Sequence, residues 1–432
     1  MERHRLADEA RIGMARILYL SPGFPPNSHL FCVAAHSRGA SVVAVGDVPE
    51  SDLAPEASQA FERYVFEPRM GEYDVLLGIV KSMIAEHGPI DFVESNGEHW
   101  LEVEGRLRDD LGIEGLTARD VRRLRSKLAM AEVFEKAGVP SVPGIRCASS
   151  AAVRGFAAKH GLPLVFKPDS GSGATSTFRV STEAELEAAL LLSLDGHVVQ
   201  PFIEGDIVTF DGLVDRAGRV VFCTSHAYDR GIMEVRAGVL DGFYYSLRSI
   251  PTALEQVGRQ ALAAFELRRR FFHLEFFARP DGSYVALEMN VRPPGGFTTD
   301  MMNLACDFDV YALWAAVILG DSFEDFSYER KFHTAHAGRR HDRDYEHSPE
   351  ALTGRLGDTL VLVTPIPAAF AATMGNTAYL LRHPRLEPLL EAIRAVQQPP
   401  HSSVGEETAG LMQGSASFNA VDTVEPPGRR EP

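Results

Sequence analysis

The stretch that decides the fold is LEMNVRPPGG, from Leu287 to Gly296. A glutamate, an asparagine and an arginine interrupt its apolar run at alternate positions, and two prolines and two glycines follow the arginine. The preceding residues extend it to FHLEFFARPDGSYVALEMN, which reads as a β-hairpin. Asp281–Gly282 in its middle is a strong signal for a two-residue turn. The sequence therefore predicts two antiparallel strands, with Glu288 and Asn290 on the second.

This hairpin predicts a row of polar side chains on one face. The turn pairs Glu275 with Glu288 and His273 with Asn290, and the alternation of a strand puts all four on the same side. Two opposed carboxylates repel each other and destabilise a sheet. A bound Mg²⁺ would reverse that effect, because this ion prefers hard oxygen ligands. A solvated sheet face, or a salt bridge to Arg292, would explain the same residues.

Composition limits the class of protein. The chain has 432 residues, 45% of them apolar and 24% charged, which is enough for two or three domains with real cores. Its net charge of −16 argues against nucleic acid or an anionic membrane as the main partner. Four scattered cysteines without a CxxC, no signal-peptide pattern and no long apolar run favour a cytoplasmic protein.

The order of patterns predicts an α/β and α+β architecture. Strands alternate with helices over residues 1–117, which predicts a Rossmann-like domain, although no GxGxxG follows its first strand. Residues 118–326 follow as a second unit. Residues 327–398 are expected to form a small α+β unit, and residues 399–432 a disordered tail.

Two segments of the middle unit bear on the site. An apolar stripe from Ala118 to Ala137 predicts one helix. VFKPDSGSGATSTFRV (Val165–Val180) predicts a strand ending at Lys167, a glycine-rich turn and a second strand. It is not a P-loop, yet its backbone N–H groups could close over phosphates beside the lysine. An ordinary flexible hairpin is the alternative.

As an ordered set, these motifs resemble the ATP-grasp superfamily, in particular its carboxylate–amine ligases and biotin-carboxylase-like members. The resemblance covers about Ala15 to Gly320. It implies a Rossmann-like domain followed by a two-lobed ATP-grasp fold over residues 118–326, with a mobile lid at about 145–205. It implies ATP-binding roles for Lys127 of SKLAM, Lys167, Ser172, Gly173 and Ala174 of the loop, and Gln200, Phe202, Ile203 and Asp206 of VVQPFIEGD. It implies Glu275, Glu288 and Asn290 as ligands of Mg²⁺ or Mn²⁺, and catalytic roles for Arg292, Lys167 and Arg236. For Arg236, an arginine of a surface loop is the alternative.

The chain departs from the resembled pattern at the hinge. Asp206 stands near the place of an acid that often binds ribose, so this contact is either replaced or missing. Pro201 removes one backbone donor there. Neither change removes a residue that is expected to bind phosphate or metal.

Four further residues are candidates for the substrate pocket: Glu98, His273, Tyr244 and Gly295. Glu98 either binds a substrate amine or occupies the first turn of a helix, where an acid suits the dipole. His273 either lies near the metal or simply packs, and Tyr244 either lines the pocket or belongs to the core. The histidine-rich segment HTAHAGRRHDRDYEH (His333–His347) is interpreted as a solvated connector.

The resemblance implies carboxylate activation: ATP phosphorylates a substrate carboxylate, and an amine then displaces phosphate to form an amide. The expected partners are a small carboxylate and a small amine, amino acids among them, and a homodimer is common in the resembled family. A carboxylase acting on bicarbonate, with a separate carrier protein, is one alternative. A nucleotide-binding scaffold without turnover is the other.

Overall fold

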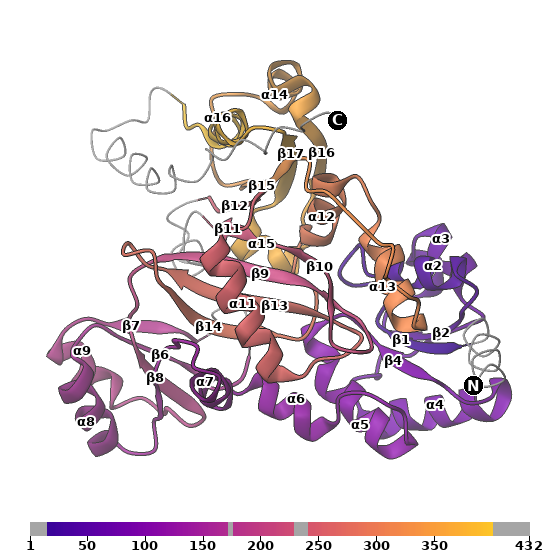
Figure 1. Ribbon diagram of the computed structural model, residues 1–432, viewed down its shortest axis with the longest axis horizontal. Helices are drawn as coiled ribbons and strands as arrows, with labels where there is room; N and C mark the ends of the chain where they lie inside the picture. Colours follow the sequence, from indigo (N-terminus) through magenta and orange to yellow (C-terminus); the bar gives the residue numbers. More distant parts are fainter. Residues whose placement is uncertain (1–14, 172–175, 229–240, 401–432) are drawn as a thin grey trace, which may run out of the picture.

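A computed structural model describes residues 15–171, 176–228 and 241–400 (Figure 1). The described residues contain three β-sheets. One is a parallel sheet near the N-terminus, one is a small antiparallel sheet, and the third is a large antiparallel sheet that lies between the other two in space. This confirms the mixed α/β fold class expected from the sequence.

The N-terminal sheet has the strand order β3-β2-β1-β4, and its strands run parallel. Its strands are β1 (Arg16–Leu20), β2 (Ser41–Gly46), β3 (Arg63–Phe66) and β4 (Phe92–Glu94). Its helices are α2 (His29–Ser37), α3 (Pro55–Ala60), α4 (Tyr73–His87) and α5 (Leu101–Leu111), with 3₁₀ turns at Glu50–Asp52 and Glu98–Trp100. Strands alternate with helices, as the Rossmann-like prediction requires.

Two helices, α6 (Ala118–Arg125) and α7 (Lys127–Lys136), follow the N-terminal layer. The prediction of one continuous helix here is wrong. Ser126 adopts an extended conformation, and its hydroxyl accepts a hydrogen bond from the amide of Ala129, so it caps the start of α7. The break places Lys127 in the first turn of a new helix.

The small sheet has the order β5-β8-β6-β7 and is antiparallel. Its strands are β5 (Ile145–Arg146), β6 (Leu164–Pro168), β7 (Phe178–Val180) and β8 (His197–Pro201), with helices α8 (Ser150–His160) and α9 (Glu183–Ala189). This sheet occupies the region expected to form a lid. Its mobility stays a prediction.

The large sheet has the order β14-β13-β9-β11-β12-β15-β17-β16, and β10 also pairs with β9. Its first strands are β9 (Asp206–Val214), β10 (Val220–Thr224), β11 (His226–Tyr228), β12 (Phe243–Ser246), β13 (Arg270–Ala278) and β14 (Tyr284–Asn290). Helix α11 (Thr252–Phe265) covers one face (Figure 1). Gly258 permits this close approach, because a Cβ there would lie 2.5 Å from the ring of Phe210.

The C-terminal strands continue the same sheet. They are β15 (His333–Arg339), β16 (Leu360–Pro365) and β17 (Thr377–His383), accompanied by α14 (Pro349–Leu356), a 3₁₀ turn at Gly357–Thr359, α15 (Ala368–Met374) and α16 (Leu386–Gln397). The interpretation of the histidine-rich segment as a solvated connector is wrong for residues 333–339. All seven are buried, because β15 pairs with β12 on one side and β17 on the other.

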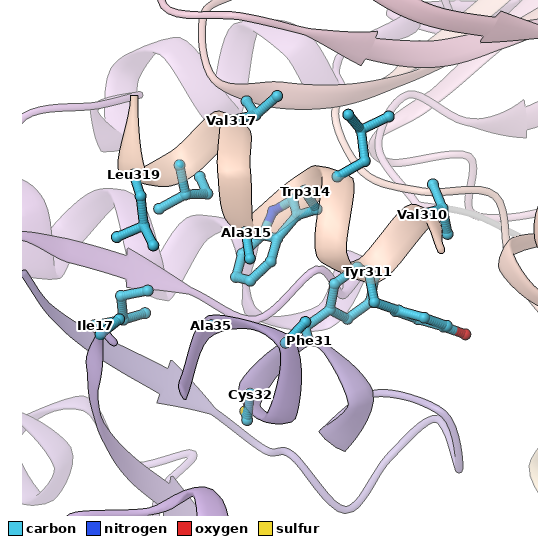
Figure 2. Close-up of a cluster of buried hydrophobic side chains, with 14 of the residues drawn as sticks. Ile17, Phe31, Cys32, Ala35, Val310, Tyr311, Trp314, Ala315, Val317 and Leu319 are labelled. Carbon is cyan, nitrogen blue, oxygen red and sulfur yellow. The ribbon is translucent and has the colours of Figure 1, made fainter. Parts of the chain in front are cut away.

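Helices α12 (Thr298–Cys306) and α13 (Val310–Leu319) join the N-terminal layer to the large sheet. Figure 2 shows α13 lying against the N-terminal elements, with Trp314 and Tyr311 directed toward Phe31. The ring of Phe31 meets those of Trp314, at 5.1 Å, and Phe271 of β13, at 5.9 Å. This core therefore fixes the large sheet against the parallel one.

In the part of the chain that the structure describes, no single helix is both long and apolar enough to cross a membrane. Helices α12 and α13, bent by 101° to each other, pass the same test only as a pair and on length and composition alone.

Candidate functional site

The hairpin β13–β14 brings together the residues predicted to bind metal. Glu275 pairs with Glu288, and His273 with Asn290, which confirms the predicted register at these positions. The predicted two-residue turn is wrong: Arg279 bonds to Ser283 across a three-residue loop in which Gly282 takes a positive φ of 81°. A bulge compensates for the longer loop, because the register shifts by one residue beside Glu275.

Each carboxylate of this pair has its own hydrogen-bond donor. The amide of Asn290 donates to Glu288 Oε1 at 3.1 Å. His273 Nε2 lies 3.0 Å from Glu275 Oε1, and its Nδ1 lies 2.6 Å from Asp211 Oδ1. Burial alone would lower the pKa of His273, but Asp211 and Glu275 outweigh it and raise the pKa to about 9. The His273 ring is therefore a cation between two carboxylates at neutral pH.

Two lysines approach the pair from other elements. Lys127 is buried in the first turn of α7, and its ammonium donates to the carbonyl of Gly171 at 3.1 Å. Lys167 ends β6, and burial lowers its pKa to about 8, aided by Lys127 and opposed by Glu288 and Glu275. One small hollow has Lys127, Gly171 and Glu288 in its wall. The two lysines and the carboxylate pair therefore lie in the same region of the protein.

Arg292 and Glu98 are brought together although 194 positions separate them in the chain. Glu98 lies in a 3₁₀ turn after β4 and accepts from Arg292 Nε at 3.2 Å and from Arg125 Nε at 3.0 Å. The first-turn position was one of the two interpretations of Glu98. The structure adds that this carboxylate holds the guanidinium of Arg292 at the edge of the site.

Two of the residues predicted to form the adenine hinge lie at a cavity of about 490 Å³. Its wall includes Phe202 and Ile203, which follow β8, and Pro280 and Val285 of the hairpin. Gln200 instead points into the protein, where its amide donates to the carbonyl of Val142 at 3.2 Å. Asp206 begins β9.

The remaining candidates are placed as follows. Tyr244 is buried on β12, and its hydroxyl lies 3.1 Å from Thr298 Oγ1. Gly295 accepts from the same hydroxyl through its carbonyl, and the space where its Cβ would stand is open. Ser172, Gly173, Ala174 and Arg236 lie outside the described residues, so their roles stay predictions.

Sequence reasoning missed two residues of this region. Asp211 is fully buried on β9 and contacts both His273 and His226. Asp169 accepts from the hydroxyl of Ser126 and the amide of Leu128, which ties α7 to β6. A carboxylate inside the apolar strand VTFDGLV is a signal that could have identified Asp211, because an unpaired buried charge is costly.

The oxygen donors fit a magnesium ion that shares its coordination with a phosphate. Within the described ranges, no three His, Cys, Asp or Glu side chains are grouped to hold a metal by themselves. Glu275, Glu288 and Asn290 supply two carboxylates and one amide. Mg²⁺ typically takes one or two carboxylates and completes its shell with water and substrate phosphates, so this smaller set suffices.

The middle of the chain matches the sequence model of a known domain. Residues 124–293 match the sequence model of the ATP-grasp domain. This range contains both lysines, the hinge, the hairpin and Arg292. This part of the chain is therefore similar to the ATP-grasp domain.

Similar proteins of known name belong to the same fold. The L-arginine-specific L-amino acid ligase of Bacillus subtilis is 23% identical over 241 residues, which are 52% of this chain and 58% of that protein. The crystal structure of L-amino acid ligase from Bacillus licheniformis is similar with a TM-score of 0.69 at 17% identity, over 88% of this chain and 96% of that chain.

The biotin carboxylase domain of Hydrogenobacter thermophilus 2-oxoglutarate carboxylase, a dimer solved with magnesium ADP and bicarbonate, has a TM-score of 0.66 at 16% identity. It covers 88% of both chains. At such identities the likeness shows the shared fold. The aligned part spans little more than half of the B. subtilis ligase.

Proposed function

We propose that this protein is an ATP-dependent ligase that joins a carboxylate to an amine through an acyl phosphate, with release of ADP and phosphate. The observation that carries the proposal is the convergence of Lys127 and Lys167 on Glu288, with Arg292 on the strand extension beyond Asn290. Such a set of cations and metal-binding oxygens suits phosphoryl transfer, in which positioning and charge neutralisation supply most of the catalysis.

Each residue has a role in this proposal. Glu275, Glu288 and Asn290 would hold Mg²⁺ or Mn²⁺, which would supply charge neutralisation at the phosphates of ATP. Lys127 and Lys167 are fixed cations at the phosphates, and Arg236 and the loop residues Ser172, Gly173 and Ala174 are assigned to the same phosphates. Arg292, held by Glu98, orients the substrate carboxylate for attack on the γ-phosphate.

The 490 Å³ cavity at the hinge is proposed to hold the adenine. Phe202 and Ile203 supply apolar contacts there, and Asp206 is assigned to the ribose. Gln200 acts indirectly, because its amide is already bonded to Val142. Its role is to fix the strand that leads into the hinge.

Amino acids are the substrate class that we propose first, as carboxylate and as amine. Two of the similar proteins named above are L-amino acid ligases, and the space where a Cβ of Gly295 would stand is open. We place the enzyme in the cytoplasm and allow for a homodimer, as in the carboxylase dimer named above.

The test is a product screen with the full-length chain, Mg²⁺ and ATP. Release of ADP and phosphate with single amino acids and with pairs is the expected result. AMP and pyrophosphate as main products would exclude the acyl-phosphate route. Turnover with bicarbonate alone would support a carboxylase, and no turnover with any carboxylate would support a nucleotide-binding scaffold.

A further inference from the structure

A second hydrogen-bonded group lies on the same face of the large sheet, and no role was assigned to it above. Asp211 of β9 uses one carboxylate oxygen for His273 and the other for His226, whose Nδ1 lies 2.7 Å away. The amide of His226 also donates to Thr209 Oγ1 at 3.0 Å. Both Asp211 and His226 are essentially inaccessible to solvent, so their geometry is fixed by the sheet.

The partner of His226 determines its tautomer. A carboxylate only accepts hydrogen bonds, and the pKa of Asp211 is held at about 2 by His273 and His226 against the opposing effect of burial. The proton of a neutral His226 ring therefore resides on Nδ1, and Nε2 carries a lone pair. This Nε2 is buried, and it has no hydrogen-bond partner within the described part of the chain. A buried polar atom without a partner costs about 1–3 kcal/mol and calls for an explanation.

The position of His226 relative to the proposed metal ligands explains why its Nε2 has no partner. Glu275 pairs with Glu288 on one side and with Thr209 on the other, and β11 pairs with β9 so that His226 lies opposite Thr209. His226 is thus two strands away from Glu275 in the same cross-strand row. Adjacent strands are about 4.8 Å apart, so their backbones are separated by roughly 10 Å, a distance that a small substrate spans.

We propose that His226 is the general base that removes a proton from the amine substrate, and that Asp211 is the positioning residue that directs its lone pair. This inference rests on the ligase function proposed above. An amine substrate is mostly an ammonium ion at neutral pH and has no lone pair for attack. His226 Nε2 takes one proton from it. The resulting amine then attacks the acyl carbon, the C–N bond forms, the C–O bond to phosphate breaks, and the second proton leaves with the phosphate.

His336 provides a matched control. Its ring is also buried on the same sheet, stacks on Tyr244 at 5.2 Å, and has an Nε2 without a partner. No carboxylate contact orients the His336 ring in the described structure. If any buried histidine here affected turnover through packing alone, His336 and His226 would behave alike.

The experiment compares two nucleophiles with the full-length chain, Mg²⁺–ATP and a mixture of the standard amino acids. Dipeptide formation requires deprotonation of an ammonium, whereas hydroxylamine is already uncharged at neutral pH and traps the acyl phosphate as a hydroxamate. In His226→Asn the new amide can still donate to Asp211 but has no basic nitrogen. We expect dipeptide formation to fall by about 10²–10⁴-fold, the usual contribution of a general base, and hydroxamate formation to stay near the parent rate.

The ratio of the two rates is the readout, because it does not depend on the fraction of folded protein. His226→Gln should change the ratio in the same direction, and His336→Asn should leave it unchanged. An equal loss of both products in His226→Asn, or a parent-like dipeptide rate, would overturn the assignment while leaving the ligase function in place. If the parent itself forms neither hydroxamate nor ADP, the proposed function fails, and this inference fails with it.

Discussion

Asp211 controls how charge is distributed on the polar face of the large sheet. With a pKa near 2 it is ionised, and His273, with a pKa near 9, is protonated beside it. The second nitrogen of His273 faces Glu275, whose pKa is lowered by this contact despite its burial. Glu288 has the amide of Asn290 as a donor. The two opposed carboxylates are therefore partly compensated before any metal binds.

This compensation sets the expected effect of Glu288→Gln. Removal of one charge relieves the remaining cross-strand repulsion, which is worth roughly 0.2–1 kcal/mol, and here we expect the lower end. The unliganded variant should melt at or slightly above the parent temperature, Mg²⁺–ATP should stabilise it far less, and ADP release should collapse. The measurement is a pair of thermal melts beside an ADP-release assay. Glu132→Gln, an exposed change on α7, is the control, and parent-like activity in Glu288→Gln would remove the metal role.

His336 predicts a dependence of stability on pH. Burial lowers its pKa from 6.5 to about 4. Between these values the unfolded chain binds a proton that the folded chain does not, so stability falls as the pH drops from 6.5 to 4. The loss approaches about 3 kcal/mol at the low end, since each pKa unit corresponds to about 1.4 kcal/mol. In His336→Asn, chemical unfolding at a series of pH values should show a shallower decline, and an unchanged slope would contradict the prediction.

At the scale of elements, local sequence patterns correctly predicted which residues of the hairpin pair, but they missed the loop length and the bulge that produce this pairing. The true loop is one residue longer than the Asp281–Gly282 turn, and the bulge beside Glu275 restores the register. Alternation and turn signals cannot reveal such a bulge, because the bulged conformation is stabilised by packing on neighbouring strands. The break at Ser126 was missed similarly, because the apolar stripe continues through it. The pairing of β15 with β12 depends on contacts between distant segments, which no local pattern contains.

The junction between α7 and β6 positions Lys127, which is proposed to bind phosphate. Asp169 accepts hydrogen bonds from Ser126, Leu128 and Arg146, and its carbonyl accepts from the amide of Lys127. A carboxylate also suits the start of a helix. The geometry of Lys127 therefore depends on a residue that does not itself touch phosphate.

Asp169→Ala tests this dependence. The change leaves a backbone amide and a hydroxyl without their acceptor, so we expect a loss of about 1–3 kcal/mol in the free energy of unfolding. The affinity for Mg²⁺–ATP should also fall, because the helix that carries Lys127 is less firmly anchored. Denaturant unfolding and nucleotide titration check the two effects. Asp195→Ala, in an exposed loop of the same small sheet, should show neither, and an unchanged nucleotide affinity in Asp169→Ala would refute the anchoring role.

At the scale of the whole molecule, four buried charges connect the parallel sheet to the large one. Arg270 of β13 lies 3.1 Å from Glu94 at the end of β4, and Arg108 of α5 lies 3.0 Å from Glu104 and 3.3 Å from Glu94. Burial raises the pKa of Glu94, and the two arginines oppose that effect. Glu94 immediately precedes the loop that carries Glu98. The cluster thus connects the hairpin strand β13 to the residue that holds Arg292.

Arg270→Met would leave two buried glutamates with one arginine. Breaking a buried ion pair by removing one partner costs about 3–5 kcal/mol, because the remaining charge is uncompensated. The double variant Glu94→Gln/Arg270→Met should lose less than the sum of the two single variants, since it removes the stranded charge. Denaturant unfolding of the three variants measures this coupling, with Arg268→Met, at an exposed position two residues away, as the control. Additive losses would show that Arg270 and Glu94 stabilise the molecule independently, and the ionic connection between the two sheets would then carry no coupling.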